Sequence, residues 1–286
     1  MAQNMKDIKR RIGSVGSIMQ ITNAMELVSS AKLRKARTRL EKTRPYYETV
    51  YENINEILSL TKGVNSPLLE KREIKKRAIL VLASDRGLAG GYNINVVKEA
   101  EKIINKNDNV ENIIYTTGTR AVEALRKTGC RLNEDFTSVG EEPSSEDASR
   151  IGDHLANLYK DKKIDEVVVV YTKFNSVMNL EPQVLQLLPA TGFEDAGEAK
   201  TTLLEFEPSP SVVLTQMVRQ YTNVTIYGCL LEASASEQAS RRTAMENATS
   251  NGEELLDELE LLYNRARQAS ITQEISEIVG GAEALK

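Results

Sequence analysis

Apolar residues recur at steps of three and four over the first part of the chain, from about Asn4 to Leu60. The repeat passes through Ile8, Ile12, Val15 and Met19, and it still holds at Val50, Ile54 and Ile57. This spacing predicts one long helix whose apolar stripe drifts around its axis, as in a coiled coil. Proline lacks the backbone N–H that a helix uses, so we expect a kink or a local break at Pro45. Residues 1–60 are the predicted N-terminal coiled-coil helix.

The middle of the chain, residues 74–208, alternates between buried strands and amphipathic helices. The predicted elements are, in order, the strand "RAILVLASDRG" with a glycine turn, the helix "NINVVKEAEKIINK", the strand "NIIYTTG", the helix "TRAVEALRKTG", the capped helix "SSEDASRIGDHLANLYKDKK", the strand "IDEVVVVYTKFNS", and two further candidate strands in "PQVLQLLP" and "TTLLEFEP". Strands that alternate with helices are typical of an α/β domain with a mainly parallel sheet.

The pattern of the last part of the chain, residues 209–286, predicts a second long helix. Pro210 suits a first helical turn, and no proline follows it. Apolar residues recur at helical steps from Val213 to Ala235 and again from Leu255 to Ala269. Helices this long are stable only when a partner covers their apolar face. We therefore expect the two terminal helices to form an antiparallel two-helix coiled coil, with a Rossmann-like α/β domain inserted between them.

The C-terminal helix is predicted to be longer than its partner by roughly 15 to 20 residues, or ~25 Å. Its last stretch, "NRARQASITQEISEIVGGAEALK", interrupts its apolar residues with Thr272, Gln273, Glu274, Ser276 and Glu277. A half-polar overhang without an intramolecular partner either frays or lies against another protein.

The amino-acid composition limits the classes of protein to which this chain can belong. The chain has 286 residues, 41% of them hydrophobic and 27% charged, and it has no Trp. This is the composition of a protein of one or two domains that exposes most of its charge to water. Cys130 and Cys229 lie far apart, and the start of the chain resembles neither a signal peptide nor a transit peptide. Since no apolar run is long enough to span a bilayer, we expect a protein of the cytoplasm or of a membrane face exposed to it.

Positive charge is concentrated at the N-terminal end, although the net charge is −4. Eleven Lys and Arg residues against three Asp and Glu lie between Met1 and Arg44, many of them in "KLRKARTRLEKTR". The run indicates either an acidic partner or a solvated helix face, and charge alone favours the solvated face. Binding of nucleic acid, with Tyr46, Tyr47 and Tyr51 stacking on bases, fits poorly with an acidic chain that has no recognition module. Small and polar residues also interrupt the face that a membrane-bound helix would need.

The best candidate for chemistry is the glycine loop "SDRGLAGGYN", which follows a strand and precedes a helix. It lacks the Lys-Ser/Thr pair of a phosphate-binding loop, and Gly87, Gly90 and Gly91 do not have dinucleotide-binding spacing. We interpret it as a tight turn in which Asp85 and Arg86 make a surface contact or a local ion pair. His154 is the single histidine, so no metal site is predicted. We expect no catalytic residues and no cofactor.

Several stretches together resemble one family. "ASITQEISEIVGGAEA" is similar to the C-terminal signature of the gamma subunit of F-type ATP synthases, and "RIGSVGSIMQITNAMELVSSAKLRKA" resembles that family's N-terminal helix. "RPYY", "SDRGLAGGYN", "KFNS", "LLP", "FEPSP" and "SEQASRRTAMENATSNG" follow the family's order. The resemblance covers the whole chain and is to the bacterial type. Ala89 stands where the family often has Cys, and the two-cysteine insertion of the chloroplast form is missing, so thiol control is not expected.

The resemblance implies a rotor shaft, present in a single copy, that couples rotation of the ion-driven membrane c-subunit ring to ATP synthesis or hydrolysis at a hexamer of alpha and beta subunits. It implies a peripheral location on the cytoplasmic face of the bacterial cell membrane, with an epsilon subunit near the foot and no role for nucleic acid. The residues that it places against the hexamer are Met25, Lys32, Arg34, Lys35, Arg241, Arg242, Arg267, Gln268, Thr272 and Glu274. Those on the side of the c ring and epsilon are Arg44, Tyr46, Phe206 and Glu207.

Two other functions compete with the rotor shaft. One is a coiled-coil adaptor whose α/β domain binds a small ligand. The other is a nucleotide-binding enzyme that uses residues 85–93. An enzyme of this kind needs a phosphate-binding Lys or a pair of acid and base residues, and the sequence offers no convincing set.

Overall fold

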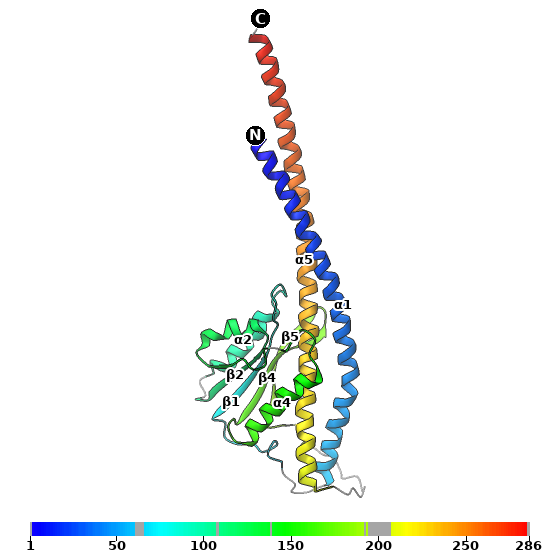
Figure 1. The fold of residues 1–286 in the computed structure, drawn as a ribbon, viewed down its shortest axis with the longest axis vertical. Helices are drawn as coiled ribbons and strands as arrows, with labels where there is room; N and C mark the ends of the chain where they lie inside the picture. Colours follow the sequence, from blue (N-terminus) through cyan, green and yellow to red (C-terminus); the bar gives the residue numbers. More distant parts are fainter. Residues whose placement is uncertain are drawn as a thin grey trace. The chain divides into compact units, whose positions relative to one another are not determined.

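The structure, a computed structural model, describes residues 2–60, 66–106, 109–137, 139–191, 193 and 207–284. The chain forms two compact units, which we call the helical unit (Met1–Ser29 with Arg241–Lys286) and the central unit (Ser30–Ser240). Helices α1 (Ala2–Leu60) and α5 (Pro210–Ala284) contribute to both (Figure 1). Within the described residues, no helix has both the length and the apolar character that crossing a bilayer requires.

The central unit contains a five-stranded sheet, as the alternation of strands and helices predicted. Its order is β3 (Arg131–Asn133), β2 (Glu111–Thr117), β1 (Lys76–Leu82), β4 (Glu166–Ser176) and β5 (Asn179–Leu188). The first four strands run parallel, and β5 pairs antiparallel with β4 as a hairpin. The prediction of a mainly parallel α/β sheet is therefore confirmed. The three-residue strand β3 was not predicted, and residues 201–206 of the candidate strand "TTLLEFEP" lie outside the described residues.

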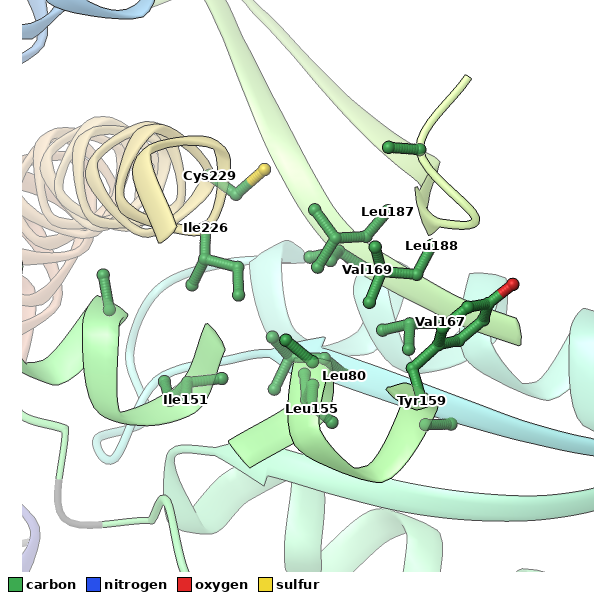
Figure 2. Packing of buried hydrophobic residues seen from close by; sticks show 14 of the residues in the cluster. Leu80, Ile151, Leu155, Tyr159, Val167, Val169, Leu187, Leu188, Ile226 and Cys229 are labelled. Carbon is green, nitrogen blue, oxygen red and sulfur yellow. The ribbon is translucent and has the colours of Figure 1, made fainter. Parts of the chain in front are cut away.

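Helices cover both faces of this sheet. Helices α2 (Tyr92–Ile104) and α3 (Thr119–Leu125, continued by the short 3₁₀ turn Arg126–Thr128) pack on one face, against alternate strand residues such as Ile79 and Val168. The other face carries α4 (Ser145–Lys160) and α5. Figure 2 shows Ile226 and Cys229 of α5 pointing toward Leu187 and Val169 of the sheet. Every residue of β1 after Lys76 is buried, as expected of a central parallel strand.

The N-cap of α4 was correctly predicted from the sequence. Ser144 accepts a hydrogen bond from the backbone N–H of Asp147, and the Asp147 side chain accepts one from the backbone N–H of Ser144. This reciprocal pairing satisfies two N–H groups that a helix start leaves free. Of the kink or local break predicted at Pro45, the local break is wrong, because α1 continues through it to Leu60. Beyond Pro45, the side chains of Val50 and Ile54 are buried in the core and hold the helix in place.

The helical unit shows an antiparallel register between α1 and α5. Thr22 and Thr249 share a hydrogen bond of 2.7 Å between their hydroxyl groups. One turn away, a methyl group on Gly252 would lie 2.5 Å from Cγ of Met19, so the glycine allows close approach. If this register is continued to the start of α1, Ala2 is level with Ala269 of α5. The rest of α5 therefore overhangs, as the difference in helix length predicted, and residues 271–282 are all exposed.

One buried carboxyl group lies between α5 and the sheet in the central unit. Glu232 accepts a hydrogen bond from the backbone N–H of Phe174, while its Oε2 is buried without a hydrogen-bond partner among the described residues. Burial raises the pKa of Glu232 above its ordinary value, and the Phe174 N–H and the Lys173 ammonium lower it by less. The neighbouring thiol of Cys229 is buried as well, which raises its pKa.

We predict that two glycine substitutions separate backbone strain from a steric clash. Gly118 and Gly129 both have positive φ, 85° and 72°, so alanine at either site costs about 1–2 kcal/mol of strain. A methyl group on Gly118 would also lie 2.3 Å from the carbonyl oxygen of Ala83, whereas Gly129 has open space around it. In urea unfolding, G118A should therefore lose ~1–3 kcal/mol more stability than G129A. Equal losses would show that the turn relaxes around the methyl group.

We also predict that Glu232→Gln stabilises the protein in a pH-dependent way. The folded-state pKa of Glu232 lies above the unfolded-state value, so its unfavourable contribution is absent at low pH and develops as the pH rises through the folded pKa. Gln keeps an acceptor for the N–H of Phe174 and carries no charge. Calorimetry should show a higher melting temperature for E232Q at about pH 8 and little change at about pH 4. The control is Glu260→Gln, an exposed site on the same helix. A pH-independent effect of E232Q would contradict the assignment.

Candidate functional site

The glycine loop after β1 is a tight turn held by its own side chains. The backbone N–H of Ser84 donates to Oδ1 of Asn93 at 3.0 Å, and the Ser84 hydroxyl donates to the carbonyl of Arg86 at 2.7 Å. Asp85 accepts a hydrogen bond from the backbone N–H of Thr119, the first residue of α3, at 3.0 Å. The Asp85 carboxylate therefore stabilises the start of a helix. Arg86 forms an ion pair at 3.5 Å with Glu141, which lies far along the sequence and was not among the predicted contacts.

Helix α5 closes the position where an open parallel sheet usually binds a ligand. That position is the crevice at the carboxyl ends of strands next to a reversal of strand order, here between β1 and β4. The Ser240 hydroxyl donates to the carbonyl of Ala89 in the turn at 2.7 Å, and the Ser236 hydroxyl donates to the carbonyl of Thr172 in β4 at 3.1 Å. The cavity that remains beside Gly91 and Ser240 measures about 70 Å³. Ligand pockets usually measure roughly 300–1,000 Å³, so a nucleotide does not fit here.

The residues predicted to contact the hexamer lie on the terminal helices α1 and α5. On α1, Lys32 and Lys35 point to one loop of the α/β part of the chain, residues 140–143, which we call the acidic loop. Lys32 forms an ion pair with Glu141, Lys35 forms one with Glu142 at 2.6 Å, and Arg39 reaches Glu142 at 3.2 Å. Arg34 is exposed, and Met25 is half-buried. The positive run on α1 therefore has an acidic partner within its own chain.

Electrostatics in this cluster follow from the short distances. The hydrogen bond from the Lys35 ammonium lowers the pKa of Glu142 below its ordinary value, and the nearby charges of Lys35, Arg39 and Lys32 lower it further. Glu142 is exposed, with 46% of its side chain accessible, while Glu141 retains only 19%. The pair between Lys32 and Glu141 is therefore better shielded from solvent and salt than the pairs of Glu142.

Two predicted contact residues on α5 differ in exposure. Arg241 is buried, at 5% exposure, and Arg242 is half-buried, with its Nε lacking a hydrogen-bond partner among the described residues. A buried arginine guanidinium contributes to folding as well as to any contact with a partner. Arg242 is consequently the better position at which to test a contact with another protein.

The overhanging end of α5, residues 271–284, combines polar and apolar side chains. Thr272 and Glu274 are exposed there, and Arg267 and Gln268 are exposed just before it. The same stretch also exposes an apolar stripe that the sequence interpretation as a half-polar surface understated. Its members are Ile271, Ile275, Ile278 and Val279, with exposures of 48%, 56%, 72% and 54%. Apolar residues spaced by four, three and one share one helix face, and such a face indicates contact with a partner.

The residues predicted to lie at the foot come from α1 and from the segment that precedes α5. Arg44 and Tyr46 are exposed on α1; Arg44 pairs with Glu48 at 3.0 Å, and Gln220 donates a hydrogen bond to the Tyr46 hydroxyl. Glu207 is exposed just before α5. Phe206 lies outside the described residues. The structure therefore brings Tyr46 next to α5 but does not link these residues into one site.

Sequence reasoning missed Glu141 and Glu142. Their stretch, "GEEPSSED", has the Gly, Pro and Ser content typical of a surface loop and suggests no contact by itself. The available signal was charge complementarity: two adjacent carboxylates, and cations at positions 32, 35 and 39, which share one face of a helix. No pattern in the sequence specifies that these two segments meet, because more than a hundred residues separate them.

Comparison with known proteins agrees with the resemblance found in the sequence. A family model described as ATP synthase matches residues 4–285. The chain is 50% identical to an ATP synthase gamma chain of Alkaliphilus metalliredigens over 291 residues, with all of both chains covered. It is 42% identical to the ATP synthase gamma chain, sodium ion specific, of Acetobacterium woodii, again over all of both chains.

A solved structure of related fold has lower sequence identity. A chain in a structure of the Euglena gracilis mitochondrial ATP synthase (OSCP/F1/c-ring, rotational state 3) is 18% identical, with a TM-score of 0.70 over all of this chain and 95% of that one. This likeness supports the arrangement of a sheet with long terminal helices. The family itself is shown by the family model and by the full-length identities of 50% and 42%. The chain belongs to the ATP synthase gamma chain family.

Proposed function

We propose that this protein is the central rotor shaft of an F-type ATP synthase, which couples rotation of an ion-driven membrane ring to ATP synthesis or hydrolysis at the catalytic subunits. The observation that carries this proposal is the full-length identity of 50% to an ATP synthase gamma chain. As a member of this family, the chain is a subunit of the synthase and is not itself catalytic. The filled crevice at the carboxyl ends of β1 and β4 agrees with a non-catalytic role.

The terminal helices act as an antiparallel two-helix coiled coil, and the α/β domain is Rossmann-like. Support for the coiled coil comes from the contacts in each unit. Thr22 meets Thr249 in the helical unit, and Leu33 and Ala36 pack with Ala235 and Ala239 in the central unit. The strand order β3-β2-β1-β4-β5, with helices on both faces, supports the Rossmann-like description. The boundaries 1–60, 74–208 and 209–286 remain our proposed domains.

The partners are the alpha and beta subunits of the hexamer, the epsilon subunit and the membrane c-subunit ring, with one gamma chain per complex. The complex lies on the cytoplasmic face of a bacterial cell membrane. Bacterial gamma chains with up to 50% identity support this setting. Arg44, Tyr46, Phe206 and Glu207 face the c ring and epsilon in this proposal, while Asp85, Arg86, Gly87, Gly90 and Gly91 form a structural turn.

The overhanging end of α5 is the part that turns inside the hexamer. Its described side chains are exposed, so none is needed for the folding of this chain. Arg267, Gln268, Thr272 and Glu274 supply polar contacts, and solvated polar contacts contribute only ~0–1 kcal/mol each. The stripe of Ile271, Ile275 and Ile278 adds apolar contact. Weak contacts of both kinds suit a surface that must release its neighbour at every step. The other proposed contacts with the hexamer are Met25, Lys32, Arg34, Lys35, Arg241 and Arg242.

Assembly tests the function directly. We expect the purified chain alone to show no ATP hydrolysis, and we expect it to form an active, stoichiometric ATPase with alpha and beta subunits of the Alkaliphilus metalliredigens relative. Native mass spectrometry measures the single copy of the chain, and phosphate release measures activity. The control omits the chain from the same mixture. Failure to enter the complex under conditions in which the relative's own gamma chain does so would contradict the proposed function.

Thr272→Ala combined with Glu274→Ala tests the overhanging end. Both side chains are exposed, so the free energy of unfolding of the isolated chain should change by less than about 0.5 kcal/mol. In the assembled enzyme, the two lost contacts should lower the rate of ATP synthesis severalfold, because each contributes ~0–1 kcal/mol. Unfolding is measured on the isolated chain, and assembly and ATP synthesis are measured on the complete enzyme with its membrane ring. A wild-type rate of synthesis would remove these two residues from the contact surface.

A further inference from the structure

The acidic loop joins three parts of the central unit that are far apart in sequence. Glu141 and Glu142 pair with Lys32, Lys35 and Arg39 on α1. The carbonyl of Glu141 accepts a hydrogen bond from the hydroxyl of Ser234 on α5 at 2.8 Å. The carboxylate of Glu141 also pairs with Arg86 in the turn after β1. One short loop thus contacts α1, α5 and the sheet-to-helix turn at once.

The loop is held in position from both sides. On its N-terminal side, Val139 is buried, and its backbone N–H donates to the carbonyl of Phe136 at 3.2 Å. On its C-terminal side, Pro143 is buried, and Ser144 is fixed by the capping box of α4. The two carboxylates are therefore presented to α1 by a backbone that is already ordered, which lowers the entropic cost of forming the ion pairs.

Apolar contact also holds this part of α1, so the acidic loop is not its only attachment. Leu33 and Ala36 pack with Ala235 and Ala239, and Phe174, Val177 and Leu180 of the β4–β5 hairpin pack against them. Lys32 and Lys35 flank Leu33 and Ala36 on α1. The apolar contact fixes where α1 lies, while the ion pairs govern whether its positive charges are available to another molecule.

We propose that residues 140–143 are an intramolecular latch: they occupy Lys32, Lys35 and Arg39 of α1 and compete with any acidic protein surface for those cations. This inference rests on the proposed function only for the identity of that surface, which belongs in that proposal to the alpha and beta subunits. The exchange replaces one carboxylate partner with another, so its net free energy is small and it is readily reversed. The basic run is then a switchable contact and not a permanently open one.

Lysine labelling in the isolated full-length chain tests the latch without any other subunit. The variant E141Q/E142Q removes both charges with little change in shape. Acetylation of Lys32 and Lys35, followed by mass spectrometry at low salt, should be about 1.5- to 5-fold faster in the variant than in the wild type, the range expected for partly exposed ion pairs. Lys42, exposed on the same helix, should react at an unchanged rate. Equal rates for Lys32 and Lys35 in the two proteins would overturn the latch, and so would an equal rise at Lys42.

Polyglutamate serves as the acidic probe for the competition. E141Q/E142Q should bind polyglutamate more tightly than the wild type does, and adding K32Q/K35Q should abolish the gain. The matched control E253Q/E254Q removes two exposed carboxylates of α5 and changes the net charge equally. A control that gains as much affinity as E141Q/E142Q would reduce the effect to net charge and overturn the proposal.

The single variant E142Q covers the case in which the double variant does not fold, because it alters only an exposed side chain. It should speed labelling of Lys35 and leave Lys32 protected by Glu141. A failure of the chain to assemble with alpha and beta subunits would count against the rotor function, and it would leave these labelling and binding results unaffected.

Discussion

The central unit depends on the packing of α5 across one face of the sheet. Between Thr222 and Ala239 this helix is mostly buried, with Ile226, Ala235, Ser236 and Ala239 at 0% exposure. A helix of 75 residues cannot rely on intrinsic propensity for its stability, so an apolar partner along part of its length is a requirement. The sheet supplies that partner through Val169 and Leu187, and α4 supplies more through Ile151 and Leu155.

The same packing explains why this α/β domain has no room for a ligand at its usual place. Small side chains let α5 approach the sheet, and the hydroxyls of Ser236 and Ser240 satisfy the carbonyls of Thr172 and Ala89. In an enzyme of this topology, the carboxyl edge of the strands stays open for substrate. Here the sheet uses that edge to hold a helix. The glycine turn after β1 is correspondingly a structural turn, in which Asp85 stabilises the start of α3.

Local sequence patterns predicted most of the helices and strands. They failed where contacts between residues far apart in the sequence determine the structure. Apolar residues at steps of three and four identified α1 and α5, and buried runs such as "AILVL" identified the strands. Strand β3 is three residues long and mixes Arg, Leu and Asn, so it has no periodicity to detect. The break expected at Pro45 does not occur because tertiary contacts of Val50 and Ile54 outweigh the loss of one helical hydrogen bond.

The candidate contact residues were less predictable than the fold, since charge in a sequence does not reveal what it meets. The basic run that contains Lys32 and Lys35 has the composition of an open basic surface, yet these two lysines pair with Glu141 and Glu142. The sequence also does not reveal that Arg241, one of the proposed contacts, is only 5% exposed in this chain. The overhang of α5 followed from helix lengths alone, but its apolar stripe was obscured by the intervening polar residues.

Burial along α5 divides the helix into parts with different physical demands. Residues between Thr222 and Ala239 determine stability, because truncation of a buried side chain leaves a cavity. Residues 271–282 are exposed, so their substitution acts on contacts with other molecules and barely on folding. A rotor shaft needs this separation, since the surface that repeatedly makes and breaks contact must not be the surface that keeps the chain folded. The same separation holds for α1. Apolar packing of Leu33 and Ala36 fixes the position of this helix, while exchangeable ion pairs with the acidic loop control whether its positive charges are available to another molecule.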